Sequence, residues 1–240
     1  MVTQLSWSNN LIILSRCKTQ EERSFYLNLA VAERYSKREL ERQINSGVFE
    51  RTLLADKNFS GTDRKLPEAA RGVFKDAYVF DFLNLPPIHS EKDLQKALLA
   101  SLKDFILELG RDFTFISQEY RIQVGNSDFF IDLLFYHRDL RCLIAFELKT
   151  DKFRPEYLGQ LEFYLEALDR DVKKNHENGS IGILLCRDKD DEVVEYALSR
   201  SLSPSIVAEY ETRLIPKEIL RKKINEFYEL LDAHVESEER

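Results

Sequence analysis

The sequence predicts an α/β protein in which a helical N-terminal region precedes a domain of alternating strands and helices. Three observations support this prediction. Capping-box patterns followed by apolar residues at helical spacing occur within residues 1–84. Two prolines interrupt the chain at Leu85-Pro86-Pro87, so we expect residues 85–90 to form a linker. Short apolar runs then alternate with helical patterns in the order αβββαβαβα, which assigns residues 91–235 to the second domain.

The N-terminal region is predicted to contain two helices packed as a helix-turn-helix. Thr19–Glu22 fits a capping box, and Ser36–Glu39 fits a second one that opens a helix through Phe49 or beyond. This second helix presents side chains suited to DNA phosphates and base edges, although a solvated helix face with i,i+4 ion pairs is the alternative. The candidate DNA-binding side chains of this helix are Arg38, Arg42 and Gln43.

Each element of the second domain follows from a local pattern. Ser90–Asp93 fits a capping box, and Gly110 follows the end of the helix that this box opens. Apolar and aromatic runs bounded by turn residues predict strands, and Pro155 and Pro216 mark helix starts. The predicted strands are 115–124, 129–136, 141–149, 181–186 and 205–210, and the predicted helices are 90–109, 155–168, 190–200 and 216–234.

The strands at 129–136 and 141–149 should pair as a β-hairpin through a turn at 137–140. In an antiparallel hairpin, the two residue numbers of every pair add up to the same total. A two-residue loop at 139–140 or a four-residue loop at 138–141 makes that total 279. Asp132 and Glu147 then lie directly opposite each other. A three-residue loop would instead shift the register and separate the two carboxylates.

Opposed carboxylates repel each other, so this pair predicts a divalent cation between them. Mg²⁺ prefers oxygen ligands, typically one or two carboxylates together with water and substrate phosphate. Lys149 lies two residues beyond Glu147 on the same strand face, where it can orient water or stabilise charge on phosphate. A buried carboxylate neutralised by Lys149, without any chemistry, is the alternative.

The helix that Pro155 opens adds Gln160 and Tyr164, one turn apart and therefore on one face. Gln160 is a candidate active-site residue, and Tyr164 either supports it or packs in the core. Lys152 and Arg154 precede this helix and are candidates for contact with the DNA backbone, with a solvated loop as the alternative.

These residues and their flanking text resemble the PD-(D/E)XK nuclease superfamily, and more narrowly its YhcG-type family, over nearly the whole chain. The matching text is 129–137, Phe146-Glu147-Leu148-Lys149, 155–160, Leu5-Ser6-Trp7-Ser8 and 38–44. The resemblance implies a mixed sheet flanked by helices, preceded by a winged-helix-like region. It also implies that Asp132 and Glu147 bind Mg²⁺ or Mn²⁺, that Lys149 is catalytic, and that Gln160 supports it near Tyr164.

Two features depart from the family pattern. The superfamily often has a glutamate on the first core helix, where this chain has Gln95, and Glu91 is the candidate substitute. Related chains also tend to have more sequence before Leu5-Ser6-Trp7-Ser8, which suggests a shortened N-terminal domain.

Composition narrows the function classes further. The net charge of −7 argues mildly against nonspecific nucleic-acid binding, but residues 1–84 hold 13 basic and 11 acidic residues and are the more basic part. Three dispersed cysteines and four dispersed histidines argue against a zinc site, and His137 is expected to be a solvated turn residue. The chain shows neither a membrane-length apolar run nor a signal-peptide pattern, so a cytoplasmic location is the default expectation.

The leading hypothesis is therefore a Mg²⁺-dependent DNA endonuclease. The alternative is a non-catalytic DNA-binding or assembly module that retains the nuclease fold, which Gln95 would suit. A hydrolase that acts on sugars with paired carboxylates explains neither Lys149 nor Gln160. A homodimer also fits the resemblance, because many such nucleases need two sites to cut two strands.

Overall fold

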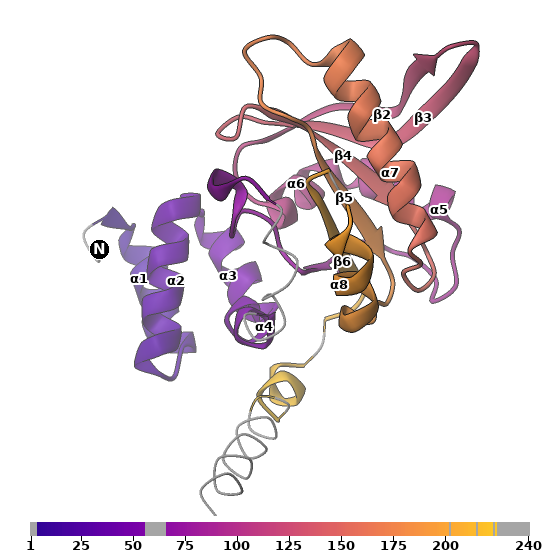
Figure 1. The fold of residues 1–240 in the computed structure, drawn as a ribbon. Coiled ribbons are helices and arrows are strands. Elements are labelled where there is room, and N and C mark those ends of the chain that lie inside the picture. The colour runs from indigo at the N-terminus through magenta and orange to yellow at the C-terminus, as the bar shows by residue number, and fades with distance from the viewer. Residues whose placement is uncertain (1–3, 56–65, 202, 215, 223, 225–240) are drawn as a thin grey trace, which may run out of the picture. The chain divides into compact units, whose positions relative to one another are not determined.

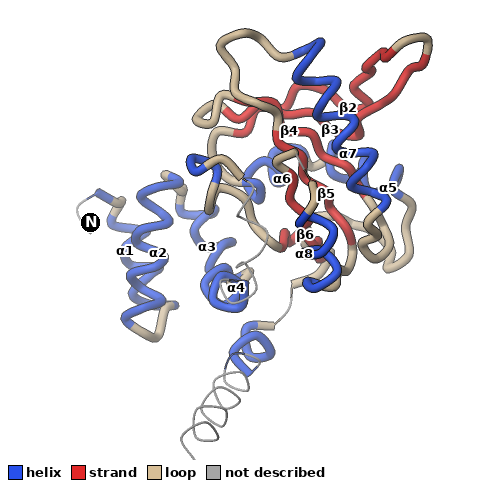
Figure 2. The backbone as a smooth tube through the Cα atoms, viewed as in Figure 1, coloured by secondary structure: helices blue, strands red, loops and turns tan. Residues whose placement is uncertain are grey.

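The computed structural model describes residues 4–55, 66–201, 203–214, 216–222 and 224. The chain divides into two compact units, one formed by residues 1–57 together with 214–240 and the other by residues 58–213. Figures 1 and 2 show the helices of the first unit and the sheet of the second. Within the described part of the chain, no helix has both the length and the apolar character needed to cross a membrane.

The first unit is helical, as predicted, and three of its helices begin at a Ser or Thr cap. The Ser36 side chain and Glu39 form a complete capping box, whereas Thr19 caps its helix and Glu22 accepts a hydrogen bond from the Lys18 N–H. The helix predicted to run through Phe49 is instead interrupted at Ser46-Gly47, where Gly47 takes a φ of +65°. The helices are α1 (Trp7–Arg16), α2 (Gln20–Glu33), α3 (Lys37–Asn45) and α4 (Val48–Ala55), and residues 217–222 are also helical.

Two buried carboxylates tie the C-terminal segment to this helical unit. Glu22 and Glu50 each have a side chain only 1% exposed. Lys217 Nζ lies 3.4 Å from a Glu22 oxygen, and the Arg221 guanidinium lies 3.0 Å from a Glu50 oxygen. Because buried carboxylates need such partners, residues 217–222 belong with the N-terminal helices. They do not belong to the 91–235 domain that the sequence predicted.

The second unit is built on one mixed six-stranded sheet in the order β1-β6-β5-β4-β3-β2. Strands β2, β3 and β4 are antiparallel neighbours, and β4, β5, β6 and β1 pair in parallel. The strands are β1 (Ala77–Val79), β2 (Phe113–Val124), β3 (Ser127–His137), β4 (Cys142–Leu148), β5 (Ile181–Cys186) and β6 (Ser205–Glu211). The helices are α5 (Glu91–Ala100), α6 (Leu102–Leu109), α7 (Glu156–Ala167) and α8 (Asp191–Ser199), with short helical turns η3 (Glu68–Ala70) and η4 (Leu168–Val172).

Helices cover both faces of this sheet, which confirms the predicted α/β architecture (Figure 1). On one face, Leu94 and Phe105 of α5 and α6 pack with Phe146 in a single apolar cluster. On the other, Leu161 of α7 and Val194 of α8 belong to a second cluster. Every residue of β4 is buried, so the central strand is held from both sides.

The structure differs from the sequence prediction in two places of this unit. Residues 77–79 form β1 and pair with β6, so the proline-containing segment 85–90 lies inside the sheet unit, whereas the sequence predicted a linker there. A strand of three residues is too short to show alternation, so β1 could not be predicted from its residue pattern. The predicted helix 90–109 is broken at Ser101 into α5 and α6.

We expect Arg221→Ala to lower the free energy of unfolding by about 2 kcal/mol, because it leaves Glu22 and Glu50 with less neutralising charge. Urea unfolding followed by circular dichroism measures this change. Lys37→Ala, at an exposed position of α3 in the same unit, is the matched control and should change stability by less than about 0.5 kcal/mol. Equal effects of the two substitutions would contradict the role assigned to the buried carboxylates.

Candidate active site

The β3–β4 hairpin has the register that the sequence predicted. Its pairs run from His137↔Cys142 to Leu133↔Phe146, and the numbers of each pair total 279. The loop therefore comprises the four residues 138–141. Asp132 and Glu147 come at the next position along the two strands, beyond the last pair of the ladder, so the direct opposition predicted for them is not part of the observed pairing.

Asp132 lies at a twist in the β2–β3 ribbon, where the side chains on one side of the ribbon pass from one face of the sheet to the other. The side chains of Ile131 and Leu133 belong to the clusters on opposite faces of the sheet, although they are two residues apart on one strand. Glu119 faces this point on β2 with a φ of +43°, and the ladder passes from Gln118 to Tyr120 without pairing it. This twist turns Asp132 toward the end of β4, where its Oδ2 accepts the Leu148 N–H at 2.8 Å.

Glu147 and Lys149 form a buried ion pair at the end of β4. Lys149 Nζ donates to Glu147 Oε1 at 2.8 Å, and the Glu147 residue is only 2% exposed. Lys149 Nζ also lies 3.6 Å from Oε2 of Glu91, which comes from the first turn of α5. Among the described residues, the second carboxylate oxygen of Glu147 is buried and accepts no hydrogen bond.

Burial and the neighbouring charges shift the protonation of this group of residues. Burial, reinforced by the nearby Asp132 carboxylate, raises the pKa of Glu147 to about 7. Burial also raises the pKa of Asp132, although the hydrogen bond from Leu148 acts in the opposite direction. For Lys149, burial lowers the pKa, but the carboxylates outweigh it and the net shift is upward, so the lysine stays charged.

The donor set fits a hard divalent cation that keeps several waters. Two carboxylates in electrostatic contact, one of them with a buried oxygen that lacks a partner, lose mutual repulsion when a cation binds between them. In the portion of the chain that the structure describes, no group of three or more His, Cys, Asp or Glu residues could form a metal site by itself. A cation held by Asp132 and Glu147 would therefore need water or phosphate for its remaining coordination positions.

Gln160 and Tyr164 lie on α7 and form a hydrogen bond with each other. Gln160 Nε2 donates to the Tyr164 hydroxyl at 2.8 Å, with Gln160 exposed and Tyr164 only 5% exposed. Tyr164 packs in the core cluster on the α7 face and is also close enough to Glu147 and Asp132 for their charges to raise its pKa, after the larger effect of burial. Both roles considered for Tyr164 are thus compatible with its position.

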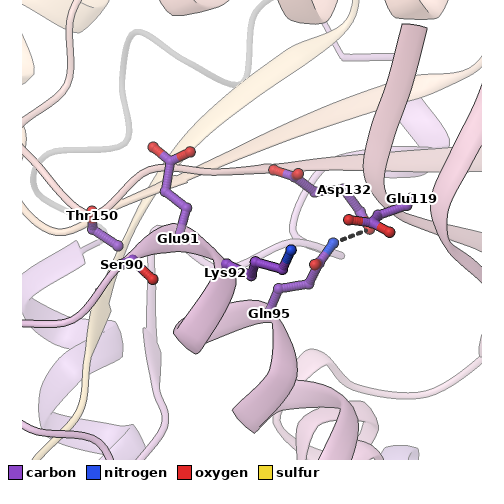
Figure 3. A pocket seen from close by; sticks show the side chains of 7 residues that line it. All are labelled: Ser90, Glu91, Lys92, Gln95, Glu119, Asp132 and Thr150. Atoms are coloured by element: carbon purple, nitrogen blue, oxygen red, sulfur yellow. Dashed lines mark hydrogen bonds between the residues drawn. The ribbon is translucent and has the colours of Figure 1, made fainter.

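An open pocket of about 490 Å³ lies between α5, the middle of β3 and the segment that follows β4. In Figure 3, the Gln95 side chain reaches across it, and its Nε2 donates to the backbone oxygen of Asp132 at 2.9 Å. Gln95 thus contacts Asp132 without contributing a carboxylate, whereas Glu91 does bring one to the pocket. Lining residues that the sequence analysis did not single out are Ser90, Lys92, Glu119 and Thr150.

The candidate DNA-binding side chains differ in their exposure. Lys152 and Arg154 are exposed in the segment between β4 and α7, near Asp188 and Asp151 respectively. In the helical unit Arg38 is exposed and Arg42 is partly buried, but Gln43 is 2% exposed and so is not free to read a base edge.

His137 is also buried, and its Nδ1 accepts the Leu140 N–H, so the expectation of a solvated turn residue is wrong. The ring packs edge-on against Phe113, because the face of β3 that carries His137 is covered in the core. The turn itself is displaced to the four residues that follow.

Family comparisons match most of the chain. A model described as the YhcG PDDEXK nuclease domain matches residues 71–225, and one described as the DUF1016 N-terminal domain matches residues 1–51. The Escherichia coli (strain K12) protein named "Putative nuclease YhcG" is 35% identical over 201 residues, which cover 82% of this chain and 54% of that protein. The chain thus spans about half the length of this curated relative.

Comparison with solved structures finds more distant likenesses. A repair endonuclease from Pyrococcus abyssi aligns with a TM-score of 0.34 and 19% identity, covering 54% of this chain and 49% of that one. A structure titled as a complex of EndoMS with dsDNA2 aligns with a TM-score of 0.38 and 18% identity, covering 55% of this chain and 48% of that one.

The raised pKa of Glu147 predicts how the stability of the metal-free protein changes with pH. The folded-state pKa of about 7 exceeds the ordinary value of 4.5, so the folded protein holds a proton that the unfolded chain releases. The stability contributed by this group is complete below pH 4.5 and is lost as the pH rises through 7. At pH 8, the free energy of unfolding of Glu147→Gln, which stays neutral, should therefore exceed that of the wild type by about 1–3 kcal/mol. Its urea midpoint should be higher in consequence.

Urea unfolding in EDTA at pH 5 and pH 8 measures this difference. Glu166→Gln, an exposed position on α7, is the matched control and should follow the wild type at both pH values. A Glu147→Gln protein with the same pH dependence as the wild type would show that Glu147 is already ionised in the folded state.

Proposed function

The chain belongs to the family of YhcG PDDEXK nucleases, and from that premise we propose that it is a metal-dependent DNA endonuclease that hydrolyses phosphodiester bonds. The observation that carries the proposal is the buried Glu147 carboxylate, which has one oxygen on Lys149 and one without a hydrogen-bond partner among the described residues. A site of this kind is costly for stability alone, because burial opposes ionisation. This cost favours a catalytic use of the carboxylate.

In the proposed mechanism, Asp132 and Glu147 hold the cation. Mg²⁺ or Mn²⁺, when bound, supplies positive charge that polarises the phosphate and favours ionisation of an attacking water. The Leu148 N–H fixes Oδ2 of Asp132, which leaves the other Asp132 oxygen for coordination. Glu147 must be ionised to serve as a ligand, so the proposal implies that cation binding displaces its proton.

Lys149 is the proposed catalytic cation. Its side chain is 10% exposed, and its ammonium carries charge throughout the neutral pH range and lies beside the carboxylates. From there it can donate a hydrogen bond to the attacking water or to a phosphate oxygen on which charge develops. Gln160, exposed on α7 and oriented by the Tyr164 hydroxyl, is proposed to position the substrate.

DNA is the proposed substrate, and basic side chains of each unit are proposed to contact it. Lys152 and Arg154 lie a few residues beyond Lys149 and are more than half exposed, so they are suited to the phosphate backbone. Arg38 and Arg42 of α3 are proposed as a second contact of the helical unit with DNA. A homodimer would supply the two sites that cutting both strands requires.

A non-catalytic DNA-binding or assembly module is the second candidate, and one observation favours it. The first core helix brings an amide, Gln95, to Asp132 where related nucleases often carry a carboxylate. Glu91, 3.6 Å from Lys149, weakens this reading because it restores an acid to the same helix.

The wild-type protein should nick supercoiled plasmid or cleave branched DNA with Mg²⁺ or Mn²⁺ and lose this activity in EDTA. Glu147→Ala and Lys149→Ala should each reduce the rate by about 100-fold or more, because the first removes a ligand of the proposed cation and the second removes a positive charge that stabilises the transition state. Glu166→Ala is the control and should cleave as the wild type does.

Cleavage that survives both active-site substitutions would refute the assigned site. An absence of cleavage on every substrate, with DNA binding retained and unchanged in Glu147→Ala, would favour the non-catalytic module.

Metal binding can be measured without any nuclease activity. A cation that binds only the folded state at 100 times its Kd stabilises it by about 2.7 kcal/mol. We expect Mg²⁺ or Mn²⁺ to raise the unfolding midpoint of the wild type but not of Asp132→Asn or Glu147→Gln. An equal rise in all three proteins would place the cation elsewhere.

A further inference from the structure

The Lys149 ammonium is bordered on three sides. Two of its neighbours are the carboxylates of Glu147 and Glu91, at 2.8 and 3.6 Å. The third is the face of the Tyr157 ring, whose centroid lies 5.2 Å from Nζ. A cation at this distance from an aromatic face is attracted to the electrons of the ring.

The Tyr157 ring is itself anchored. Its hydroxyl donates to Asp151 Oδ2 at 2.7 Å, and the Arg154 guanidinium lies 3.1 Å from the same oxygen. The backbone oxygen of Asp151 accepts the Arg187 N–H at 3.1 Å, which ties this segment to the end of β5. Burial and the Asp151 carboxylate raise the pKa of Tyr157, so its hydroxyl remains a donor.

We infer that Tyr157 is a positioning residue that keeps the Lys149 ammonium in the active site by presenting its ring face, with Asp151 fixing the ring. This inference rests on the proposed nuclease function.

The need for such a residue follows from the two roles of Glu147. In the proposed mechanism this carboxylate binds a cation, which repels the lysine and weakens the ion pair that now holds Lys149. Glu91 still pairs with Lys149 in that case, but at 3.6 Å and from a side chain that is 47% exposed. Lysine has a flexible stem and a compact charge, so a further contact is needed to keep its ammonium from turning toward water.

The ring also suits the chemistry better than a third carboxylate would. An aromatic face attracts an ammonium without fixing the direction of its N–H groups. Lys149 can therefore keep its place and still donate hydrogen bonds to water or phosphate. Simple packing of the first turn of α7 is the competing explanation for Tyr157, and it predicts an effect on stability alone.

The kinetic test compares Tyr157→Leu, which removes the ring face, with Tyr157→Phe, which keeps it and removes the hydroxyl. Tyr157→Leu should lower kcat about tenfold with little change in KM, because Lys149 acts in the transition state. Tyr157→Phe should lower kcat about threefold at most, since only the hydrogen bond that fixes the ring is lost. Tyr196→Leu, at an exposed position of α8, is the matched control and should cleave as the wild type does.

A spectroscopic test needs no cleavage. In metal-free protein labelled with ¹³C-lysine, the ε-methylene resonance of Lys149 is assigned by its loss in Lys149→Met. The ring above it should shift this resonance upfield of the other lysines. Tyr157→Leu should abolish the shift, and Tyr157→Phe should retain it.

An unshifted Lys149 resonance in the wild type, or one that Tyr157→Leu leaves unchanged, would overturn the inference. Equal losses of kcat in the Leu and Phe variants, or a wild-type kcat in Tyr157→Leu, would also overturn it. If the wild type cleaves no substrate, the proposed function fails, and the resonance alone then decides whether Tyr157 holds Lys149. Unfolding midpoints of the three variants identify any that fail to fold.

Discussion

The burial of Glu147 beside Asp132 is the constraint on which the rest of the site depends. Burial disfavours ionisation of both carboxylates, so each neighbouring contact acts to offset that cost. Lys149 neutralises one Glu147 oxygen and the Leu148 N–H satisfies one Asp132 oxygen. The remaining Glu147 oxygen has no such contact among the described residues, and this oxygen is the one that the proposed cation would neutralise.

The sheet supplies the rigidity that such a site requires. β4 is buried along its whole length and delivers Glu147 and Lys149 from one strand end. Asp132 reaches the same place because the β2–β3 ribbon changes face at that residue, opposite the left-handed backbone of Glu119. A non-glycine residue in this left-handed region costs free energy, which the surrounding sheet must offset. The regular strand β4 and the irregular backbone at Glu119 therefore both contribute to the site.

The parts of this arrangement that depend on local spacing could be predicted from sequence. The hairpin register followed from the position of one turn, and it correctly brought Asp132 and Glu147 to adjacent strands. Features that depend on distant segments could not be predicted. The Tyr157 ring contacts Lys149 only because the chain turns from β4 into α7. Gln43 is buried by tertiary packing, although its place in a polar helix sequence predicts an exposed side chain.

The return of residues 217–222 to the N-terminal helices has a consequence for biosynthesis. The chain is made from its N-terminus, so α1 to α4 leave the ribosome long before Lys217 and Arg221 exist. Until then Glu22 and Glu50 lack these cations, and burying them would leave two charges poorly neutralised. The helical unit therefore reaches its final state only after the whole sheet unit, which interrupts it in sequence, has been translated.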